Sequence, residues 1–430
     1  MSFSWLPDAT LDPHPRLTWL VECGFDFTVR VLYNKEEILP PDYRLEPGTL
    51  VVSNHQRDAD IPILTTVLCR REGLHIRWPL PFYATREDIF HPEFLRNRLL
   101  DLGWNRLLAS WLGSIPLGWL LRITRARPLR RVREFTTDET LRLLLETLPP
   151  DTNPGNLFSA RGTREILDCL GSMPVKLQQL DPHCLGEIGR NFWGLRRLNR
   201  STIRKISPVF RSQTAAQLKD FAHLLDAGRI VFLAPEGTIS EEGYFRRIRA
   251  GAWQICQITA HPPNLLPLAL GYDPLGPGRL RIVVRIGTVK NPPYPATRAA
   301  FDSMLKTAIL KLHPITPSHL ISRFLRAGPR RFTTVEFRSW IERATRVIRT
   351  TRLTLDPLLN RAPQAKLTGS RLAWLARHGL IEPDGSAWIN RYPVATLPGW
   401  RRPAATVTYL DNALSDITDL EPGLAAALDP

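Results

Sequence analysis

The sequence of 430 residues predicts an α/β fold, and two patterns along the chain support this class. Between about residues 25 and 290, short apolar runs typical of buried strands alternate with segments typical of helices. Beyond about residue 300, the pattern changes to Arg-rich helical segments. We therefore expect a mixed sheet flanked by helices in residues 1–295, and a mainly helical region of unassigned role in residues 296–430.

The first part of the chain contains three predicted strands. Phe27–Tyr33 (FTVRVLY) is rich in β-branched and aromatic residues, Thr49–Ser53 (TLVVS) is a short apolar run, and Leu80–Thr85 is a third candidate. The second of these leads directly into NHQRDADIPIL. A strand, a polar turn and an apolar helix in this order often form a functional site.

Further elements follow after about residue 210, where the periodicity is clear again. The predicted helices are Gln213–Ala227, which ends at Gly228, Gly251–Ala260 and Lys366–Ile381. The predicted strands are Ile230–Leu233, Leu265–Tyr272 and Leu280–Gly287. The last helix faintly resembles part of a helix-turn-helix, but it offers no recognisable charged recognition face, so nucleic acid is not an expected partner.

An Arg-rich stretch of about residues 122–210 reads as an insertion into the predicted α/β domain. It is interrupted by DTNPGN at residues 151–156. From Glu187 to Asp220 no acidic residue intervenes among many Arg and Lys residues. This is the strongest basic cluster of the chain.

The net charge of +16, from 57 Lys and Arg against 41 Asp and Glu, predicts an anionic partner such as nucleic acid or a phospholipid surface. The uncharged, Trp-containing stretch Leu107–Leu121 is too short to span a bilayer comfortably. It fits either a segment that enters a membrane interface or a buried core helix. We expect an anionic membrane surface as a partner.

Five cysteines without a C-x-x-C pair, and an N-terminus without a basic and then apolar signal pattern, favour a reducing compartment. We expect a cytoplasmic protein, peripheral on the inner face of the membrane. Neither G-x-x-x-x-G-K-[ST] nor G-x-G-x-x-G occurs, and no Cys or His cluster has metal-ligand spacing. No cofactor or metal is therefore expected.

His55 follows a predicted strand and precedes Asp58 and Asp60. An imidazole that a carboxylate orients is the minimal general base for a hydroxyl nucleophile. Residues five apart on a helix lie about 140° apart, so His55 must precede the helix if it is to meet Asp60. Taken alone, the spacing is more typical of an ordinary surface turn, and the residues alone do not choose between the two carboxylates.

The segment PEGT, residues 235–238, follows the predicted strand Ile230–Leu233. It offers a carboxylate, a hydroxyl and backbone N–H groups to a polar ligand. An ordinary turn or a helix N-cap has the same composition.

Together, NHQRDAD, PEGT and the later strand with LLPLAL resemble the PlsC-like glycerolipid or lysophospholipid acyltransferases over about residues 25–290. The resemblance implies their fold and the transfer of an acyl chain from acyl-CoA or an acyl carrier protein thioester. It implies a lysophospholipid or glycerol-phosphate-type acceptor whose hydroxyl attacks the thioester directly. No covalent intermediate or cofactor is then needed.

The resemblance also implies roles for single residues. His55 matches the catalytic base and Asp60 the carboxylate that orients it. Glu236, Gly237 and Thr238 match the block that binds the glycerol or phosphate part of the acceptor. A phosphate-binding Arg is placed at Arg211, with GSIPL at residues 113–117 as the competing position for that motif. Pro267 matches the proline of the last motif, and Gly251 matches a glycine that follows the acceptor block.

Two positions depart from the family pattern. Ile239 stands where an Arg usually follows Glu-Gly-Thr, and Arg57 stands where a small hydroxyl residue is usual. Either an Arg at 246, 247 or 249 takes over the phosphate contact, or the acceptor carries no phosphate monoester. The alternatives to the predicted function are therefore acyl transfer to a phosphate-free lipid alcohol, or a catalytically inactive protein that binds anionic lipid.

Overall fold

A computed structural model of the chain describes most residues from 15 onward, in these ranges: 15–41, 43–57, 59–68, 71–72, 75–76, 81–86, 105, 108, 121–122, 125–129, 137–180, 195–240, 242–392 and 403–430. The chain divides into two compact units. One comprises residues 1–83 and 223–430, and the other residues 84–222. The predicted stretch Leu107–Leu121 and the competing motif at 113–117 lie largely or wholly outside the described residues.

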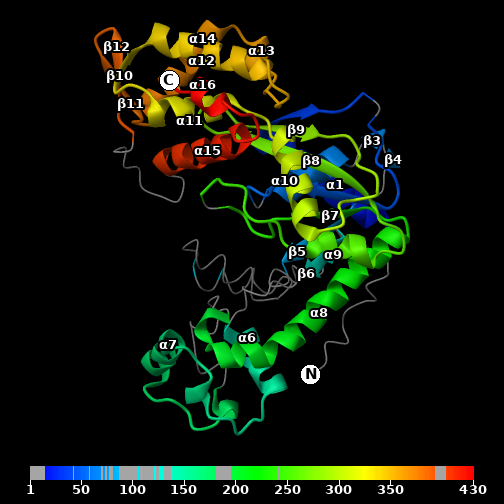
Figure 1. The fold of residues 1–430 in the computed structure, drawn as a ribbon. Coiled ribbons are helices and arrows are strands. Elements are labelled where there is room, and N and C mark those ends of the chain that lie inside the picture. The colour runs from blue at the N-terminus through cyan, green and yellow to red at the C-terminus, as the bar shows by residue number, and fades with distance from the viewer. Residues whose placement is uncertain are drawn as a thin grey trace. The chain divides into compact units, whose positions relative to one another are not determined.

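The secondary structure follows the α/β pattern (Figure 1). The strands are β1 (Tyr33–Ile38), β2 (Thr49–Ser53), β3 (Arg71–Glu72), β4 (His75–Ile76), β5 (Phe82–Arg86), β6 (Ala126–Leu129), β7 (Val231–Leu233), β8 (Asn264–Asp273), β9 (Leu280–Ile286), β10 (Arg331–Thr333), β11 (Ile381–Asp384) and β12 (Ala387–Asn390). The helices are α1 (Pro15–Leu32), α2 (Asp60–Leu68), α6 (Thr137–Thr147), α7 (Ala160–Leu170), α8 (Arg200–Asp226), α9 (Gly251–Ile258), α10 (Arg298–Leu312), α11 (Pro317–Ala327), α12 (Thr334–Arg349), α13 (Leu358–Arg361), α14 (Gln364–Arg377), α15 (Pro403–Thr418) and α16 (Leu424–Ala427).

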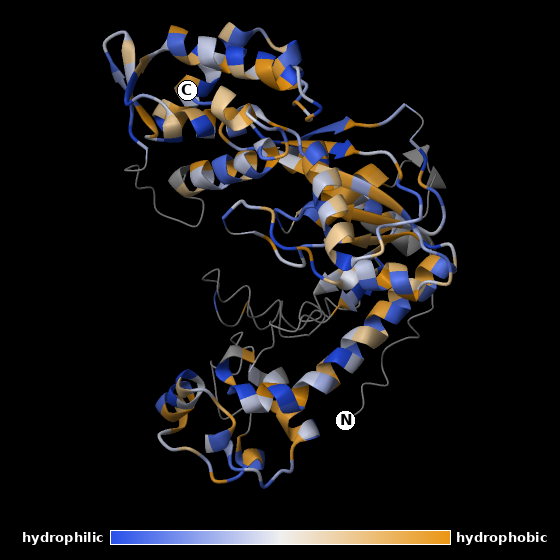
Figure 2. Ribbon diagram, in the orientation of Figure 1, coloured by the Kyte–Doolittle hydropathy of each residue, from blue (hydrophilic) through white to orange (hydrophobic). Residues whose placement is uncertain are grey.

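A seven-stranded mixed sheet has the order β1-β9-β8-β2-β7-β5-β6. The β8-β2, β2-β7, β7-β5 and β9-β1 pairs are parallel, and β8 and β9 are antiparallel. This confirms the predicted α/β class with a mixed sheet flanked by helices. The central strands are mostly apolar, as Figure 2 shows, because strands covered on both faces exclude polar side chains.

The central strand β2 explains where the polar motifs meet. All five of its residues are buried, and it pairs in parallel with β8 on one side and β7 on the other. Since parallel neighbours end at the same edge of a sheet, the chain that leaves β2 and the chain that leaves β7 emerge side by side. These two segments begin with Asn54 and Ala234. The topology thus places NHQRDAD next to PEGT.

The core around the sheet is formed by apolar side chains from both motif-bearing strands and from α2. Ile63, Leu64, Val67 and Leu68 of α2 are fully buried against the sheet. At about 25 cal/mol per Å² of apolar surface, burial of such side chains contributes about 1.5–3 kcal/mol each. This packing fixes the start of α2 relative to the end of β2.

The predicted strand Phe27–Tyr33 was wrong, because these residues form the last turns of α1 and only Tyr33 begins a strand. In a strand, Phe27, Val29 and Val31 would share one face. Val29 is buried, whereas Phe27 is 69% and Val31 49% exposed. This burial pattern fits a helix, in which successive residues turn by about 100°. β-Branched residues favour strands only weakly against such packing.

Apart from the start of α8, which lies at Arg200 and not at the predicted Gln213, the other predicted elements lie within a few residues of observed ones, and Leu80–Thr85 corresponds to β5. Thr49–Ser53 is β2, and Ile230–Leu233, Leu265–Tyr272 and Leu280–Gly287 correspond to β7, β8 and β9. The predicted helices correspond to the end of α8, to α9 and to α14. Gly228, where the first of them is expected to end, has a φ of +71°, as residues just past a helix end often do.

The region beyond residue 296 is mainly helical, as predicted, and adds a small sheet of order β10-β12-β11. It belongs to the same compact unit as the large sheet. Two buried ion pairs connect it to the strands. Arg371 of α14 binds Asp273 at the end of β8 through Nη2 and Oδ2, which lie 2.5 Å apart. Arg281 of β9 binds both Asp356 and Glu36.

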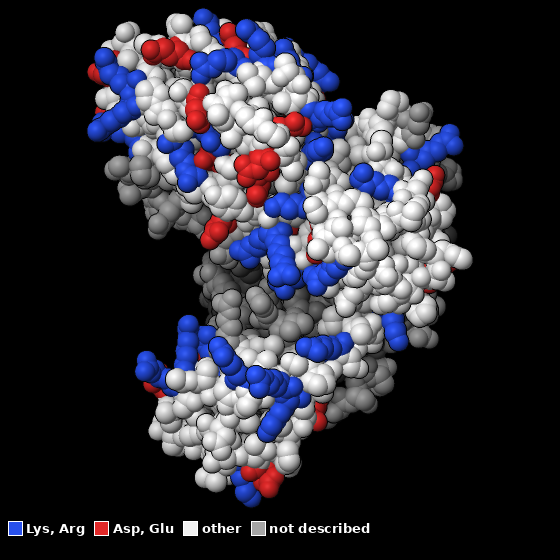
Figure 3. All heavy atoms as spheres, viewed as in Figure 1, with Lys and Arg blue, Asp and Glu red and all other residues white. Residues whose placement is uncertain are grey.

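The unit of residues 84–222 has a core of its own. Leu141, Leu144, Ile166, Ile206 and Phe210, with further apolar residues, form it. Many basic side chains of α8 are exposed, namely Arg200, Arg204, Lys205, Arg211 and Lys219. Figure 3 shows Lys and Arg on the faces of both units that it presents. The limits of the predicted insertion, about 122–210, remain a prediction.

Candidate active site

His55 lies in the turn between β2 and α2, and its imidazole Nδ1 is 2.9 Å from Oδ2 of Asp60. Asp60 is the first residue of α2, so the two side chains meet because His55 precedes the helix, as the spacing requires. Asp58, the other carboxylate that the spacing leaves open, lies outside the described residues. The arrangement is that of a histidine oriented by a carboxylate.

The Asp60 carboxylate is 1% exposed and accepts several hydrogen bonds. Its Oδ2 also accepts the backbone N–H groups of Gln56, at 2.7 Å, and Arg57, at 3.0 Å. Its Oδ1 accepts the hydroxyl of Tyr272. Because the oxygen atoms face donors only, Nδ1 of His55 also donates, and Nε2 is left with the lone pair of a general base.

Tyr272, on β8, keeps its proton under all ordinary conditions. Burial, and then the charge of Asp60, raise the pKa of its hydroxyl well above 10. The guanidinium of Arg57 stands over its ring, with Cζ 4.8 Å from the ring centroid. Tyr272 is therefore a permanent donor to Asp60. No local pattern indicates this role, because Tyr272 is separated from Asp60 by 212 residues of chain.

Asn54 fixes the turn to the sheet. Its side-chain Nδ2 donates to the carbonyl of Leu270, and its Oδ1 accepts the N–H of Leu270, both at 2.9 Å. The side chain thus continues the hydrogen-bond pattern between β2 and β8 for one residue beyond the strand. It holds the chain directly before His55.

Glu236 joins the two motifs. Its Oε1 accepts the backbone N–H of His55, at 3.2 Å, and its Oε2 accepts the backbone N–H of Arg246, at 2.8 Å. The residue is 3% exposed. Burial raises the pKa of its carboxyl group from 4.5 to about 7, although the two N–H groups and the charges of His55 and Arg246 act in the opposite direction.

Gly237 and Thr238 form a tight turn with two arginines beside it. Gly237 has a φ of +71°, which favours glycine, and its N–H donates to the carbonyl of Ala234. Nη1 of Arg246 lies 3.4 Å from Oγ1 of Thr238, and Nε of Arg249 lies 3.4 Å from the carbonyl oxygen of Glu236. Both side chains are largely exposed. Two cations therefore flank the turn in which Ile239 replaces an expected Arg.

The three remaining predicted residues lie at different distances from the His55 turn. Pro267 is buried in β8, in register with Val52 of β2, and so lies near the turn that carries His55. Gly251 begins α9, two residues after Arg249. Arg211 is exposed on α8, in the other compact unit, so its contact with an acceptor remains a prediction.

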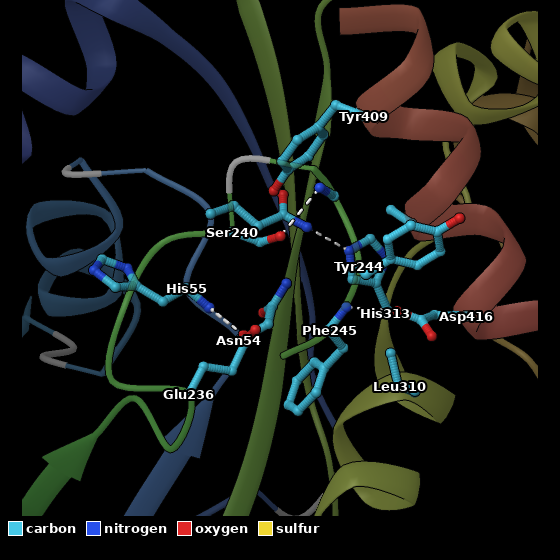
Figure 4. A pocket seen from close by; sticks show the side chains of 13 residues that line it. Asn54, His55, Glu236, Ser240, Tyr244, Phe245, Leu310, His313, Tyr409 and Asp416 are labelled. Carbon is cyan, nitrogen blue, oxygen red and sulfur yellow. Dashed lines mark hydrogen bonds between the residues drawn. The ribbon is translucent and has the colours of Figure 1, made fainter. Parts of the chain in front are cut away.

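A small open pocket adjoins the two motifs (Figure 4). On one side it is lined by residues of the motif-bearing loops, Asn54, His55, Gln56, Glu236, Ser240, Gly243, Tyr244 and Phe245. The C-terminal region supplies the rest, Leu310, His313, Tyr409, Ala413 and Asp416. In the view of Figure 4, the His55 imidazole lies on the far side of Asn54 from Tyr244 and Asp416.

Sequence reasoning missed the part of the pocket that comes from the C-terminal region. Tyr409, Ala413 and Asp416 are on α15, and their spacing is that of an ordinary amphipathic helix. No local pattern could have connected them with His55. The packing of α15 against α11 and against the loop of residues 242–246 brings them to the pocket.

Two buried histidines, His313 at the pocket and His319 behind it, are neutral at neutral pH. Nε2 of Gln56 lies 2.7 Å from Nε2 of His313. The rings of His313 and His319 pack edge to face, with their centroids 5.3 Å apart. Burial lowers the pKa of His313 to about 4 and that of His319 well below 6.5. At neutral pH these rings are hydrogen-bonding and packing groups: His313 contacts the side chain of Gln56, the residue after His55, and His319 packs behind His313 and binds Thr316.

Within the described part of the chain, no group of three or more His, Cys, Asp or Glu side chains is placed to hold a metal ion. In the same residues, no helix combines the length and the apolar character needed to cross a bilayer. The sequence matches no model of a known protein family and no curated protein.

Proposed function

We propose that the protein transfers an acyl chain from an acyl thioester, acyl-CoA or an acyl carrier protein thioester, to a hydroxyl group of a lipid acceptor. The contact between His55 Nδ1 and Asp60 Oδ2, at 2.9 Å, carries this proposal. The meeting of NHQRDAD and PEGT at one edge of the sheet supports the resemblance to the glycerolipid acyltransferases and their fold.

In the proposed reaction, Nε2 of His55 removes the proton of the acceptor hydroxyl as its oxygen attacks the thioester carbonyl carbon. The carbon–sulfur bond then breaks, and the thiolate leaves with the proton that His55 returns. Asp60 fixes the tautomer of His55 and stabilises the imidazolium that forms. General-base assistance contributes about 10²- to 10⁴-fold, and alignment of the two substrates contributes the rest.

The proposed acceptor is a lysophospholipid or a glycerol-phosphate-type molecule, held by the turn of Gly237 and Thr238. Arg246 and Arg249 beside this turn support a phosphate-bearing acceptor. Ile239 supports the alternative, a phosphate-free lipid alcohol. A panel of both kinds of acceptor distinguishes them, and Arg246→Ala with Arg247→Ala as its neighbour control tests the phosphate contact.

The proposed place of action is the surface of an anionic membrane on its cytoplasmic face, where a lysolipid acceptor resides. The net charge of +16 supports it, because each basic group near such a surface contributes about 1 kcal/mol.

The first experiment is acyl transfer measured by mass spectrometry, with purified protein, both kinds of thioester and the acceptor panel. We expect the wild type to form product and His55→Ala to form none. His261→Ala, which removes an exposed histidine in the turn before β8, is the matched control and keeps full activity. If His55→Ala keeps its turnover, His55 is not the base. If no acceptor gives product that depends on His55 but the protein binds anionic vesicles, the inactive lipid-binding alternative gains support.

A further inference from the structure

We propose that helix α15 of the C-terminal region positions His55 through Asp416, the backbone of residues 245–246, and Glu236. Asp416 and Glu236 are then positioning residues, and the C-terminal region is part of the catalytic apparatus. This inference rests on the proposed function for its kinetic consequence. It gives Glu236 a role on His55 in place of the acceptor contact that the resemblance implies.

The first link joins α15 to the loop of residues 242–246. The backbone N–H of Phe245 donates to Oδ2 of Asp416, at 2.5 Å. Nδ2 of Asn412 donates to the carbonyl oxygen of Glu242, at 2.8 Å. Gly243 lies between these contacts, and a Cβ atom there would be 1.9 Å from the carbonyl oxygen of Tyr409. Loop and helix are thus in direct contact at three successive places.

The second link joins this loop to the base. The residue after Phe245 is Arg246, whose backbone N–H donates to Oε2 of Glu236, and Oε1 of Glu236 accepts the N–H of His55. Each carboxylate oxygen of Glu236 therefore holds one backbone N–H. The residue is 3% exposed, so it presents little surface to an acceptor.

These links matter because hydrogen bonds to a buried carboxylate are strong and leave the N–H groups little freedom. Loss of one link lets the turn of His55 shift relative to the substrates. A displacement of about 1 Å can lower a catalytic rate by about 10²-fold. The helix α15 therefore acts on the position of the base without contact to its imidazole.

The test at α15 uses Asp416→Ala, with Asp419→Ala as the control. Asp419 is an exposed carboxylate that directly follows the last residue of α15, Thr418, three residues after Asp416. We expect Asp416→Ala to lower kcat about tenfold, with the KM of either substrate nearly unchanged. Asp416→Asn keeps an oxygen acceptor for Phe245 and should restore kcat to within about twofold. If Asp416→Asn lowers kcat as much as Asp416→Ala does, the hydrogen bond from the Phe245 N–H to Asp416 does not position the base.

The test at Glu236 uses Glu236→Gln, with the exposed Glu242→Gln as the control in the same loop. Glutamine has one acceptor oxygen, so it cannot hold both N–H groups. We expect kcat to fall by the same factor for every acceptor, and equally for thioester hydrolysis without acceptor. An increase of the acceptor KM with unchanged hydrolysis would instead assign Glu236 to acceptor binding and overturn the inference.

Amide hydrogen exchange tests the links without reference to turnover. In Asp416→Ala we expect faster exchange in the peptide that contains Phe245 and Arg246 and also in the peptide that contains His55. Faster exchange only in the peptide that contains Phe245 and Arg246, with unchanged exchange in the peptide that contains His55, would overturn the inference that α15 positions His55. If the wild type forms no product that the His55→Ala substitution abolishes, the proposed function is refuted. Amide hydrogen exchange would then still decide whether α15 positions the turn that carries His55.

Discussion

Asp60 determines which nitrogen of His55 acts as the base, because its carboxylate faces only donors. We predict that Asp60→Asn lowers kcat by about 10²- to 10⁴-fold, because an amide in this place can turn an N–H toward Nδ1 and favour the wrong tautomer. Steady-state kinetics of acyl transfer measures the effect. Tyr272→Phe, which removes one donor to Asp60 and keeps the ring, serves as a milder comparison.

Glu236 should make stability depend on pH. Its pKa in the folded protein, about 7, is above its ordinary 4.5, so the folded state holds a proton that the unfolded state releases between these values. The contribution of Glu236 to the free energy of unfolding is therefore greatest below pH 4.5. It declines as the pH rises from there to about 7 and is constant above that pH. The difference corresponds to about 3 kcal/mol at about 1.4 kcal/mol per pKa unit.

The variant Glu236→Gln removes this titration. We predict that its stability relative to the wild type improves by up to about 3 kcal/mol between pH 5 and pH 8. Urea unfolding at both pH values measures the difference, with Glu242→Gln as the control. The groups that face Glu236, namely the His55 ring, the Arg246 side chain and the Tyr409 hydroxyl, remain in both proteins. If the difference in the free energy of unfolding between Glu236→Gln and the wild type is the same at both pH values, burial does not raise the pKa of the Glu236 carboxyl group.

At the scale of single elements, the strands that carry the motifs were predictable from the sequence. TLVVS and IVFLA are continuous apolar runs, and a run of this kind fits a strand covered on both faces. The position of His55 in a turn also followed from its spacing to Asp60. The end of α1 was not predictable in this way, because its β-branched residues fit a strand locally and only packing against α2 decides for a helix.

The contact between α15 and the loop of residues 242–246 tests an element directly. Gly243 has a φ of +92° and no room for a Cβ beside Tyr409, whereas Gly278 has a φ of +84° and open space around it. We predict that Gly278→Ala lowers the free energy of unfolding by about 1–2 kcal/mol, because only the strain of the left-handed backbone opposes it. Gly243→Ala should cost about 3 kcal/mol or more, because the helix must also move. Chemical denaturation measures both, and equal costs would argue against close packing of α15 on this loop.

At the scale of the whole molecule, long-range contacts carry the information that the sequence lacks. The ion pair of Arg371 with Asp273 and the hydrogen bond of Asp416 with Phe245 each join residues far apart in the chain. Neither pair forms a local pattern, so the role of the C-terminal region could not be inferred from its composition.

The overall positive charge leads to a prediction for the whole protein. With a net charge of +16, we expect binding to vesicles that contain anionic phospholipid, and weaker binding as salt rises from about 50 mM to about 500 mM. Cosedimentation with vesicles measures this, and vesicles of neutral lipid are the control. Equal binding to both kinds of vesicle at every salt concentration would exclude charge as the cause.

The order of the strands has a consequence for synthesis on the ribosome. Asn54 at the end of β2 pairs with Leu270, which is 216 residues later in the chain, and β7 on the other side of β2 also follows much later. The partner strand β7 begins at Val231, 178 residues after the end of β2 at Ser53. A nascent chain that has passed β2 therefore carries an apolar strand with both edges unpaired over that length of synthesis, a state that is prone to aggregate. The pocket gains its last wall only when α15 has left the exit tunnel, so an incomplete chain cannot form it.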